Sequence, residues 1–280
     1  MKIGVMAFPT EYPVDTAVIA ERAEELGFES LWVGEHPIMP VHTTSPFPGS
    51  PDGVIPPTYS WFVDPFVALA RASGVTRSMK LGTGITLVPE RNPLLLAKEI
   101  ATLDHLSGGR FVFGIGAGWL KEETEIMGGN FEHRWTQTRE AVEAMKELWT
   151  RDEAEYHGKY YDFPPVRSFP KPAQKPHPPI FLGGTARNVF KRIVEYGDGW
   201  MPTRVTPELI KRGRETLNEM AQQAGRDPDS IEVLVYRASA DREAMKAFEE
   251  AGADSAVIFL MTETEEKVLA ELEEIARKAL

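Results

Sequence analysis

Two neighbouring residues, Glu35 and His36, are placed to do chemistry on a bound molecule. They end an apolar segment from Ser30 to His36 (SLWVGEH) that is typical of a buried strand. An imidazole changes charge near neutral pH, so His36 can donate a proton or a hydrogen bond to the ring of a ligand. Glu35 would orient that imidazole or bond the polar edge of the ring. The alternative is a structural role, in which His36 bonds a neighbouring loop.

A second candidate site follows the apolar segment IFLGG. Gly183, Gly184 and Thr185 come directly before or at the start of a predicted helix (TARNVFKRIVEYG), with Thr185 as its potential cap. The free N–H groups and the dipole at a helix start attract anions, and Arg187 in the first turn adds positive charge. So short a motif is also compatible with an ordinary tight turn. Its position at the end of a strand favours the anion site.

Glycines are concentrated in two predicted strands between Met79 and Trp119. This stretch is predicted to form a strand (MKLGTGITLVP), a helix that begins after Asn92, and a second strand (RFVFGIGAGW). Glycine weakens a strand unless something must lie close to the backbone, and we interpret that something as a flat ligand. The glycines concerned are Gly82, Gly84, Gly114, Gly116 and Gly118.

Four other kinds of site have little support in the sequence. GIGAGW is similar to a dinucleotide-binding fingerprint, but Trp119 takes the place of the third glycine and no helix is predicted to follow at once. Histidines and carboxylates have no metal-ligand spacing, so no metal is predicted. The chain has no cysteine and no GxSxG motif, which argues against a thiolate nucleophile and a serine-hydrolase elbow.

Alternating strand and helix patterns place the candidate residues at one end of a barrel. We count eight strand–helix pairs, from the strand Lys2 to Phe8 to the final pair SAVIFLM and TETEEKVLAELEEIARKAL. Such alternation implies parallel strands and predicts an α/β fold with a closed (β/α)8 barrel. Active sites of these barrels lie where the strands end. That rule selects Glu35-His36, Gly84-Ile85, Ala117-Gly118-Trp119, Gly183-Gly184-Thr185 and Thr203-Arg204.

Three segments depart from the alternation. A loop from Pro37 to about Val63 is too long for a mere connection, has no predicted structure of its own and is interpreted as a mobile lid. KEETEIMGGNFEHRW, after Trp119, is predicted to be a shorter loop. Arg151 to Pro179 is predicted to be an insertion between helix 4 and strand 5, with a small hairpin turning at His157-Gly158 and a proline-rich crossing.

Several large apolar side chains lie in or beside these loops and are candidates for the wall of an apolar pocket. For each of them simple packing is the alternative. They are Met39, Phe47, Trp61, Phe62 and Trp119.

Composition limits the class of protein. The chain has 280 residues, 42% of them hydrophobic, and no linker-like stretch, so we expect one domain over residues 1–280. The net charge of −11 and the absence of a basic stripe argue against nucleic-acid binding. The sequence shows no signal peptide and no apolar run of membrane-spanning length, which predicts a cytoplasmic protein without a membrane partner.

Taken in order, a series of sequence blocks resembles the luciferase-like monooxygenase superfamily, and within it the flavin- or deazaflavin-dependent oxidoreductases. The blocks cover nearly the whole chain at family spacing. They are WVGEH, LGTGITLVPERNPLLLAKEIATLDHLSGGRFVFGIGAGW, FEHR, GKYYDF, PKPAQKPHPPIFLGG and GDGWMP.

The resemblance implies a TIM barrel, often dimeric, that binds an isoalloxazine or deazaflavin ring in the barrel mouth. It implies a non-prolyl cis peptide between Gly84 and Ile85, in a bulge against which the ring rests. The acidic-His motif of the family corresponds to Glu35 and His36. The phosphate-binding turn corresponds to the stretch from Gly183 to Thr185.

One departure from the family concerns Trp119. The sugar-phosphate dehydrogenases of the group carry a glutamate at this position, after the strand-four glycines. A tryptophan there argues against a sugar-phosphate substrate and suits a less polar small molecule.

The leading hypothesis from the sequence is an oxidoreductase that transfers a hydride between coenzyme F-420, a deazaflavin, and a small organic substrate. The first alternative is a monooxygenase that uses reduced FMN and molecular oxygen. The second is a flavin-binding protein without turnover. A homodimer is expected from the resemblance alone.

Overall fold

Parallel β-strands form a closed ring in the computed structural model, which describes residues 1–8, 14–261 and 264–280. Within those ranges the order around the sheet is β3-β2-β1-β11-β10-β9-β8-β5-β4, and β3 also pairs with β5, which closes the ring. Because β3 and β4 are two pieces of one strand, the ring is an eight-stranded barrel. The predicted (β/α)8 barrel is therefore confirmed.

Each barrel strand is short and largely buried, as expected for parallel strands that are covered on both faces. The strands are β1 (Lys2–Ala7), β2 (Ser30–Val33), β3 (Lys80–Thr83), β4 (Thr86–Leu87), β5 (Phe111–Gly116), β8 (Ile180–Gly183), β9 (Gly199–Met201), β10 (Glu232–Ala238) and β11 (Ser255–Leu260).

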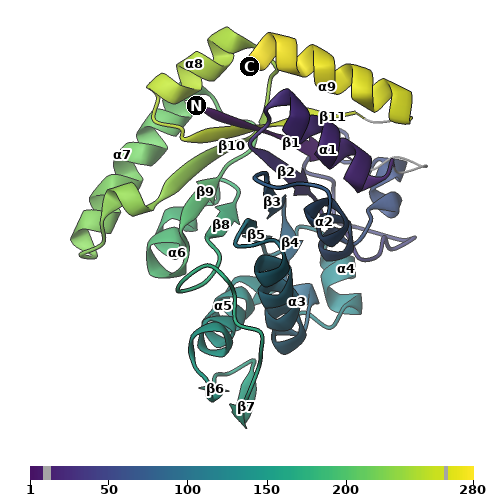
Figure 1. Ribbon diagram of the computed structural model, residues 1–280. Helices are drawn as coiled ribbons and strands as arrows, with labels where there is room; N and C mark the ends of the chain where they lie inside the picture. The colour runs from purple at the N-terminus through teal and green to yellow at the C-terminus, as the bar shows by residue number, and fades with distance from the viewer. Residues whose placement is uncertain (9–13, 262–263) are drawn as a thin grey trace.

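Helices surround the barrel. They are α1 (Thr16–Leu26), α2 (Pro65–Ser73), α3 (Pro93–Leu106), α4 (Lys121–Ile126), α5 (Arg134–Thr150), α6 (Val189–Tyr196), α7 (Pro207–Gln223), α8 (Arg242–Glu250) and α9 (Glu265–Ala279). Figure 1 shows α9, in yellow, beside α1, in purple, and Arg22 joins them through Glu273 at 2.7 Å. The helix layer therefore closes where the two ends of the chain meet.

Local sequence signals explain where several helices begin. The side chains of Asp15, Asp64 and Asn92 accept hydrogen bonds from backbone N–H groups in the first turns of α1, α2 and α3. A proline at the first position follows the cap in α2 and α3. The first residues of the final predicted helix, Thr262 and Glu263, lie outside the described residues, and α9 begins at Glu265.

The apolar core has two layers. The larger lies between the strands and the helices, and the smaller fills the inside of the barrel. Trp32 is buried in the inner layer, and a Cβ added to Gly82 would lie 2.3 Å from its ring. A Cβ on Gly114 would lie 1.9 Å from the carbonyl oxygen of Thr83.

These contacts correct the interpretation of the strand glycines. Gly82 and Gly114 make room for a protein side chain and a neighbouring strand, and Gly116 leaves space for the side chain of Ile85. The glycines do mark close approaches, but the approaching groups at these three positions belong to the protein.

Two predicted loops contain helices. The segment from Pro37 to Val63, expected to have no structure of its own, holds a 3₁₀ helix, η1 (Pro57–Trp61). The loop predicted after Trp119 contains α4. Glutamates at 122 and 123 lie in the first turn of α4, where they suit the positive end of a helix dipole. These two residues were the sequence signal from which this helix could have been predicted.

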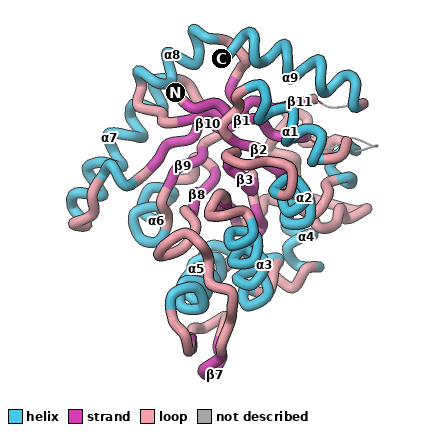
Figure 2. Tube along the Cα trace, in the orientation of Figure 1, coloured by secondary structure: helices cyan, strands magenta, loops and turns pink. Residues whose placement is uncertain are grey.

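The insertion after the fourth barrel helix is present as predicted. It consists of the hairpin β6 (Ala154–His157) and β7 (Asp162–Val166), joined through residues 158–161, and a crossing to β8. Figure 2 shows the hairpin projecting beyond the ring of helices, next to α5. The hairpin lies away from the ring of strands, whereas the crossing bonds β5 through Gln174 and Pro179.

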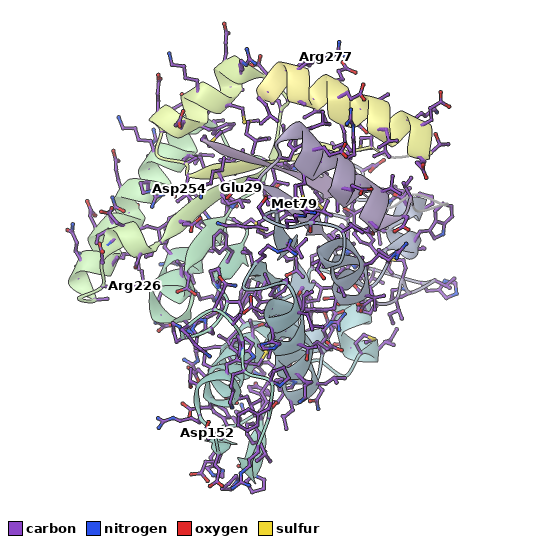
Figure 3. All side chains as sticks on the ribbon, in the orientation of Figure 1. Glu29, Met79, Asp152, Arg226, Asp254 and Arg277 are labelled. Atoms are coloured by element: carbon purple, nitrogen blue, oxygen red, sulfur yellow. The ribbon has the colours of Figure 1, made fainter. Side chains whose placement is uncertain are left out.

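The two ends of the barrel differ in the loops that they carry. Glu29, Met79 and Asp254, labelled in Figure 3, immediately precede β2, β3 and β11 and mark the N-terminal end. The opposite, C-terminal end carries the long loops, as in other barrels of this type.

None of the helices in the described part of the chain combines the length and apolarity that crossing a membrane requires.

Candidate active site

A cavity of about 560 Å³ opens at the C-terminal ends of the barrel strands. Its walls come from every barrel strand or the loop that follows it. Twelve of the thirteen residues selected from the sequence line this cavity: Glu35, His36, Gly84, Ile85, Ala117, Gly118, Trp119, Gly183, Gly184, Thr185, Thr203 and Arg204. The volume falls in the range of small-molecule and cofactor sites.

His36 is held in one orientation at the edge of the cavity. Its Nδ1 lies 2.7 Å from Oε2 of Glu123, and only 7% of the imidazole is exposed. Among the described residues no group bonds Nε2, so this nitrogen is available to a molecule in the cavity. The rings of Tyr59 and Phe62 lie 5.2 and 5.3 Å from the imidazole, centre to centre.

Glu35 does not orient His36, which corrects the first of the two roles expected of it. Its Oε1 accepts a hydrogen bond from Nε of Arg91 at 2.6 Å, and its Oε2 accepts one from the N–H of Leu87 at 2.7 Å. Burial raises the pKa of the Glu35 carboxyl, and the charge and hydrogen bond of Arg91 oppose that rise. Glu35 therefore anchors the end of β4, through Leu87, and the segment that follows it, through Arg91.

The partner of His36 is a residue that sequence reasoning missed. Glu123 is 1% exposed and belongs to α4, the helix in the predicted loop. The two residues lie 87 positions apart in the chain and meet because β2 and β5 end on the same face of the barrel. A buried carboxylate bonded to Nδ1 fixes the ring and leaves Nε2 toward the ligand, an arrangement typical of catalytic histidines.

The bond between Gly84 and Ile85 is cis, as the family resemblance implied. It lies between β3 and β4, at the edge of the cavity. The hydroxyl of Tyr236 donates a hydrogen bond to the carbonyl oxygen of Gly84 at 2.7 Å. The side chain of Ile85 packs against Gly116 and Gly183, so this bulge forms part of the cavity wall.

The glycine turn after β8 differs from its predicted form. Gly184 has φ of 95°, which favours glycine, and its N–H donates to the carbonyl oxygen of Met201 at 3.2 Å. The helix begins only at Val189, so Thr185 is not its cap. Arg187 is exposed and does not line the cavity, because the four residues between the turn and α6 carry it outward.

Two other arginines supply positive charge at the cavity. Arg204 was selected from the sequence as a strand-end residue, and Arg237 was not. Both have positive φ, 58° and 69°, which is uncommon for residues other than glycine and is often found at functional sites. Arg204 donates to the carbonyl oxygens of Pro48 and Gly49 at 2.9 and 2.6 Å and so holds the segment 37–63 against the mouth.

The apolar wall is only partly the one predicted. Phe47, Phe62 and Trp119 line the cavity, whereas Met39 and Trp61 do not. Further aromatic walls come from Phe8, Tyr59, Trp135, Tyr236 and Phe259. The cavity therefore combines aromatic walls, the imidazole of His36 and two arginines.

Comparison with known proteins points to one family. The family model described as luciferase-like monooxygenase matches residues 1–279. An uncharacterized protein of Mycobacterium tuberculosis (strain H37Rv) is 39% identical over 230 residues, which cover 81% of this chain and 80% of that protein. An F-420-dependent glucose-6-phosphate dehydrogenase of Amycolatopsis mediterranei is 28% identical over 263 residues, covering 89% of this chain and 72% of that one.

Solved structures with the same fold include enzymes of both cofactor types. The coenzyme F-420-dependent tetrahydromethanopterin reductase of Methanopyrus kandleri aligns with a TM-score of 0.78 at 20% identity, over 99% of this chain and 98% of that one. The oxygenating constituent of 3,6-diketocamphane monooxygenase of Pseudomonas putida, in complex with FMN, aligns with a TM-score of 0.67 at 22% identity, over 89% and 71%. At these identities the likeness concerns the fold.

Proposed function

The chain belongs to the luciferase-like monooxygenase family, and on that premise we propose that it is an oxidoreductase that uses coenzyme F-420. The coenzyme would occupy the barrel mouth, and the second reactant would be a small organic molecule of low polarity. The observation that carries the proposal is the cavity itself, with aromatic walls, a fixed imidazole and a cationic edge.

The residues at the mouth fit a flat tricyclic ring with a phosphate. Aromatic and glycine-lined walls suit the ring, which would rest near the Gly84–Ile85 bulge. A side chain on Gly184 would meet no atom within 4 Å, so the turn after β8 is open toward a ligand. Arg204 and Arg237 would meet phosphate or carboxylate groups.

When bound, the coenzyme supplies two-electron hydride chemistry, and the protein supplies position, a proton and protection from water. His36 can hold or release a proton at Nε2 because Glu123 occupies Nδ1. Tyr59, Phe62 and Trp119 surround the imidazole and exclude water from it.

The preference for F-420 over FMN rests on charge and on relatives. F-420 extends beyond its phosphate into a polyanionic glutamate tail, and a protein of net charge −11 needs a local basic edge to hold it. Arg204 and Arg237 supply that edge in place of Arg187. The relative in Amycolatopsis mediterranei, aligned over most of both chains, carries F-420 in its name.

A reduced-FMN monooxygenase is the second candidate. FMN shares the tricyclic ring and the phosphate, so the same bulge and turn would serve it, and one protein of the same fold is known in complex with FMN. A flavin-binding protein without turnover is disfavoured by the buried His36–Glu123 pair, because a binding role needs no fixed imidazole.

We also propose a homodimer, which light scattering of the purified protein would test.

The proposed function is tested by supplying each reduced cofactor with a panel of small carbonyl compounds and alkenes, with and without oxygen. Oxidation of reduced F-420 that needs the organic substrate and proceeds without oxygen supports the proposal. Oxygen-dependent turnover with reduced FMN, together with no F-420 binding, would establish the alternative. Arg187→Ala serves as a matched control for Arg237→Ala, since both arginines are exposed but only Arg237 lines the cavity.

A further inference from the structure

A second cavity lies beside the C-terminal end of α4, at Met127, and shares none of its described lining residues with the main one. Its volume is about 320 Å³, and its walls include Glu90, Arg91 and Glu99. Glu90 follows β4 in the short 3₁₀ helix η2 (Val88–Glu90) and is 3% exposed. A carboxyl group so deeply buried at the wall of a cavity calls for a physical explanation.

Within the described part of the chain, Glu90 and Glu123 each have one side-chain oxygen without a hydrogen-bond partner. Oε1 of Glu90 accepts a hydrogen bond from Oγ1 of Thr124 at 2.9 Å, but its Oε2 is buried and unpaired. Oε2 of Glu123 bonds His36, but its Oε1 is buried and unpaired. Two buried carboxyl groups can satisfy such oxygens by sharing a proton, directly or through one water.

The backbone at Gly118 passes close to Glu90 and Thr124. A Cβ on Gly118, which has φ of 79°, would lie 3.1 Å from both Oε1 of Glu90 and Oγ1 of Thr124. A side chain at this position would therefore press on the bond that holds Glu90. Gly118 lines the main cavity, so Glu90 and Thr124 lie directly behind its wall.

The charges around Glu90 favour its protonated form. Burial, together with the negative charges of Glu123 and Glu35, raises the pKa of Glu90 to about 8. The hydrogen bond of Thr124 and the charge of Arg91 act in the opposite direction. Glu90 therefore carries a proton at neutral pH beside the carboxylate that bonds His36.

We propose that Glu90, Glu123 and His36 form a proton path from the smaller cavity to the main one. Glu123 and His36 share the proton that lies between Oε2 and Nδ1, and Nε2 carries a second proton. His36 releases the proton on Nε2 to the molecule in the main cavity and keeps the shared proton on Nδ1, while Oε1 of Glu123 takes the proton of Glu90. Solvent in the smaller cavity protonates Glu90 again, and rotation of the Glu123 carboxyl and the imidazole restores the starting arrangement. One proton crosses, and no group is oxidised or reduced.

The path would let the aromatic mouth stay closed during the reaction. A hydride acceptor needs one proton for each hydride, and Tyr59, Phe62 and Trp119 separate His36 from water at the mouth. The use of the proton in hydride transfer rests on the proposed function. The connection between Glu90 and His36 does not, so it can be tested in the protein without cofactor.

The first experiment compares infrared spectra of the cofactor-free wild type, Glu90→Gln and Glu99→Gln between pH 5 and pH 10. The wild type should show a protonated-carboxyl band at pH 7 that disappears near pH 8. Glu90→Gln should lack that band, and Glu99→Gln, which alters a carboxyl of the same cavity bonded to Arg91, should keep it. A band that persists in Glu90→Gln would overturn the assignment of the proton.

The second experiment asks whether the loss of the proton from Glu90 changes the NMR signals of His36. In ¹⁵N spectra of the wild-type imidazole, the His36 signals should show an inflection near pH 8 that follows the infrared band. Thr124→Val, which removes the hydroxyl that bonds Glu90 and preserves side-chain shape, should shift that inflection. His36 signals that do not respond near pH 8 in the wild type would overturn the path without the need for any variant.

Turnover separates the path from the proposed function. With an active cofactor and substrate, Glu90→Gln should lower kcat at pH 7 by about tenfold or more, leave KM nearly unchanged and remove the pH dependence near pH 8. Turnover with an unchanged pH profile in this variant would overturn the path alone. Spectra as expected without any turnover would overturn the proposed function alone.

Discussion

Replacing Glu90 by glutamine should change how the stability of the protein depends on pH. The pKa of Glu90 rises from 4.5 to about 8 on folding, so the folded state prefers the neutral carboxyl. The stabilisation is fully present below pH 4.5 and is lost as the pH rises toward 8, because the unfolded chain can ionise the group and the folded chain cannot. Glutamine stays neutral and can still accept the hydrogen bond from Thr124.

The shift sets the size of the effect. A rise of 3.5 pH units, from 4.5 to about 8, at about 1.36 kcal/mol per unit corresponds to about 5 kcal/mol. Relative to wild type, Glu90→Gln should therefore gain up to about 5 kcal/mol in free energy of unfolding between pH 4 and pH 9. Other titrating groups are common to both proteins and largely cancel in the difference.

Urea unfolding of the cofactor-free proteins at pH 4, 6, 7 and 9 measures that difference. Glu99→Gln is the matched control, because Glu99 lines the same cavity but is less deeply buried and pairs with Arg91 at 3.2 Å. A constant difference between Glu90→Gln and wild type across this pH range would refute the assignment of a neutral buried carboxyl. A similar pH-dependent gain in Glu99→Gln would show that the effect belongs to the cavity as a whole.

Three further substitutions test the site and its frame. His36→Gln should lower kcat by about 100-fold or more with a small change in thermal midpoint, and wild-type kinetics would return His36 to a structural role. Gly114→Ala should destabilise the fold by about 2–3 kcal/mol or more in chemical denaturation, because its Cβ would lie 1.9 Å from a backbone carbonyl oxygen of β3. Gly74→Ala, with 3.7 Å of clearance, is its control, and equal losses would contradict the packing explanation. Arg204→Ala should speed proteolysis within residues 37–63 and leave the thermal midpoint nearly unchanged, whereas an unchanged cleavage rate would show that its two hydrogen bonds do not hold that segment.

The barrel could be predicted because its signals are local. Caps such as Asp64 and Asn92, and the left-handed Gly27 at the end of α1, act within a few residues of the helix ends that they define. Alternation of strand and helix then fixes the closed barrel, and the barrel fixes which strand ends meet. Twelve of the thirteen selected site residues line one cavity for that reason.

The pairing of charged groups could not be predicted in the same way. Glu35 and His36 are adjacent in the chain, yet each bonds a residue far away in sequence, Arg91 and Glu123. Successive residues at a strand end point in different directions, so adjacency in sequence does not imply contact. The short helix α4, which carries Glu123, has too few turns to give a periodic signal.

The strand glycines show a different limit. Their number indicates close approach to the backbone, but sequence cannot say which group approaches. At Gly82 the group is the indole of Trp32, and at Gly116 it is the side chain of Ile85, both within the protein. Arg187 was misplaced for a related reason: the chain leaves the turn after Gly184 for four residues before its helix begins at Val189.

Equilibrium binding of the two cofactors is the most direct test of the central claim, which is that the barrel mouth holds F-420. Trp119 and Trp135 line the cavity, so a bound ring should quench their fluorescence. Titration with oxidised F-420 should give saturable quenching, with a dissociation constant at least tenfold lower than that for FMN. Trp119→Phe should lose much of the signal, and Arg237→Ala should weaken F-420 more than FMN. Saturable quenching by FMN with none by F-420 would contradict the claim.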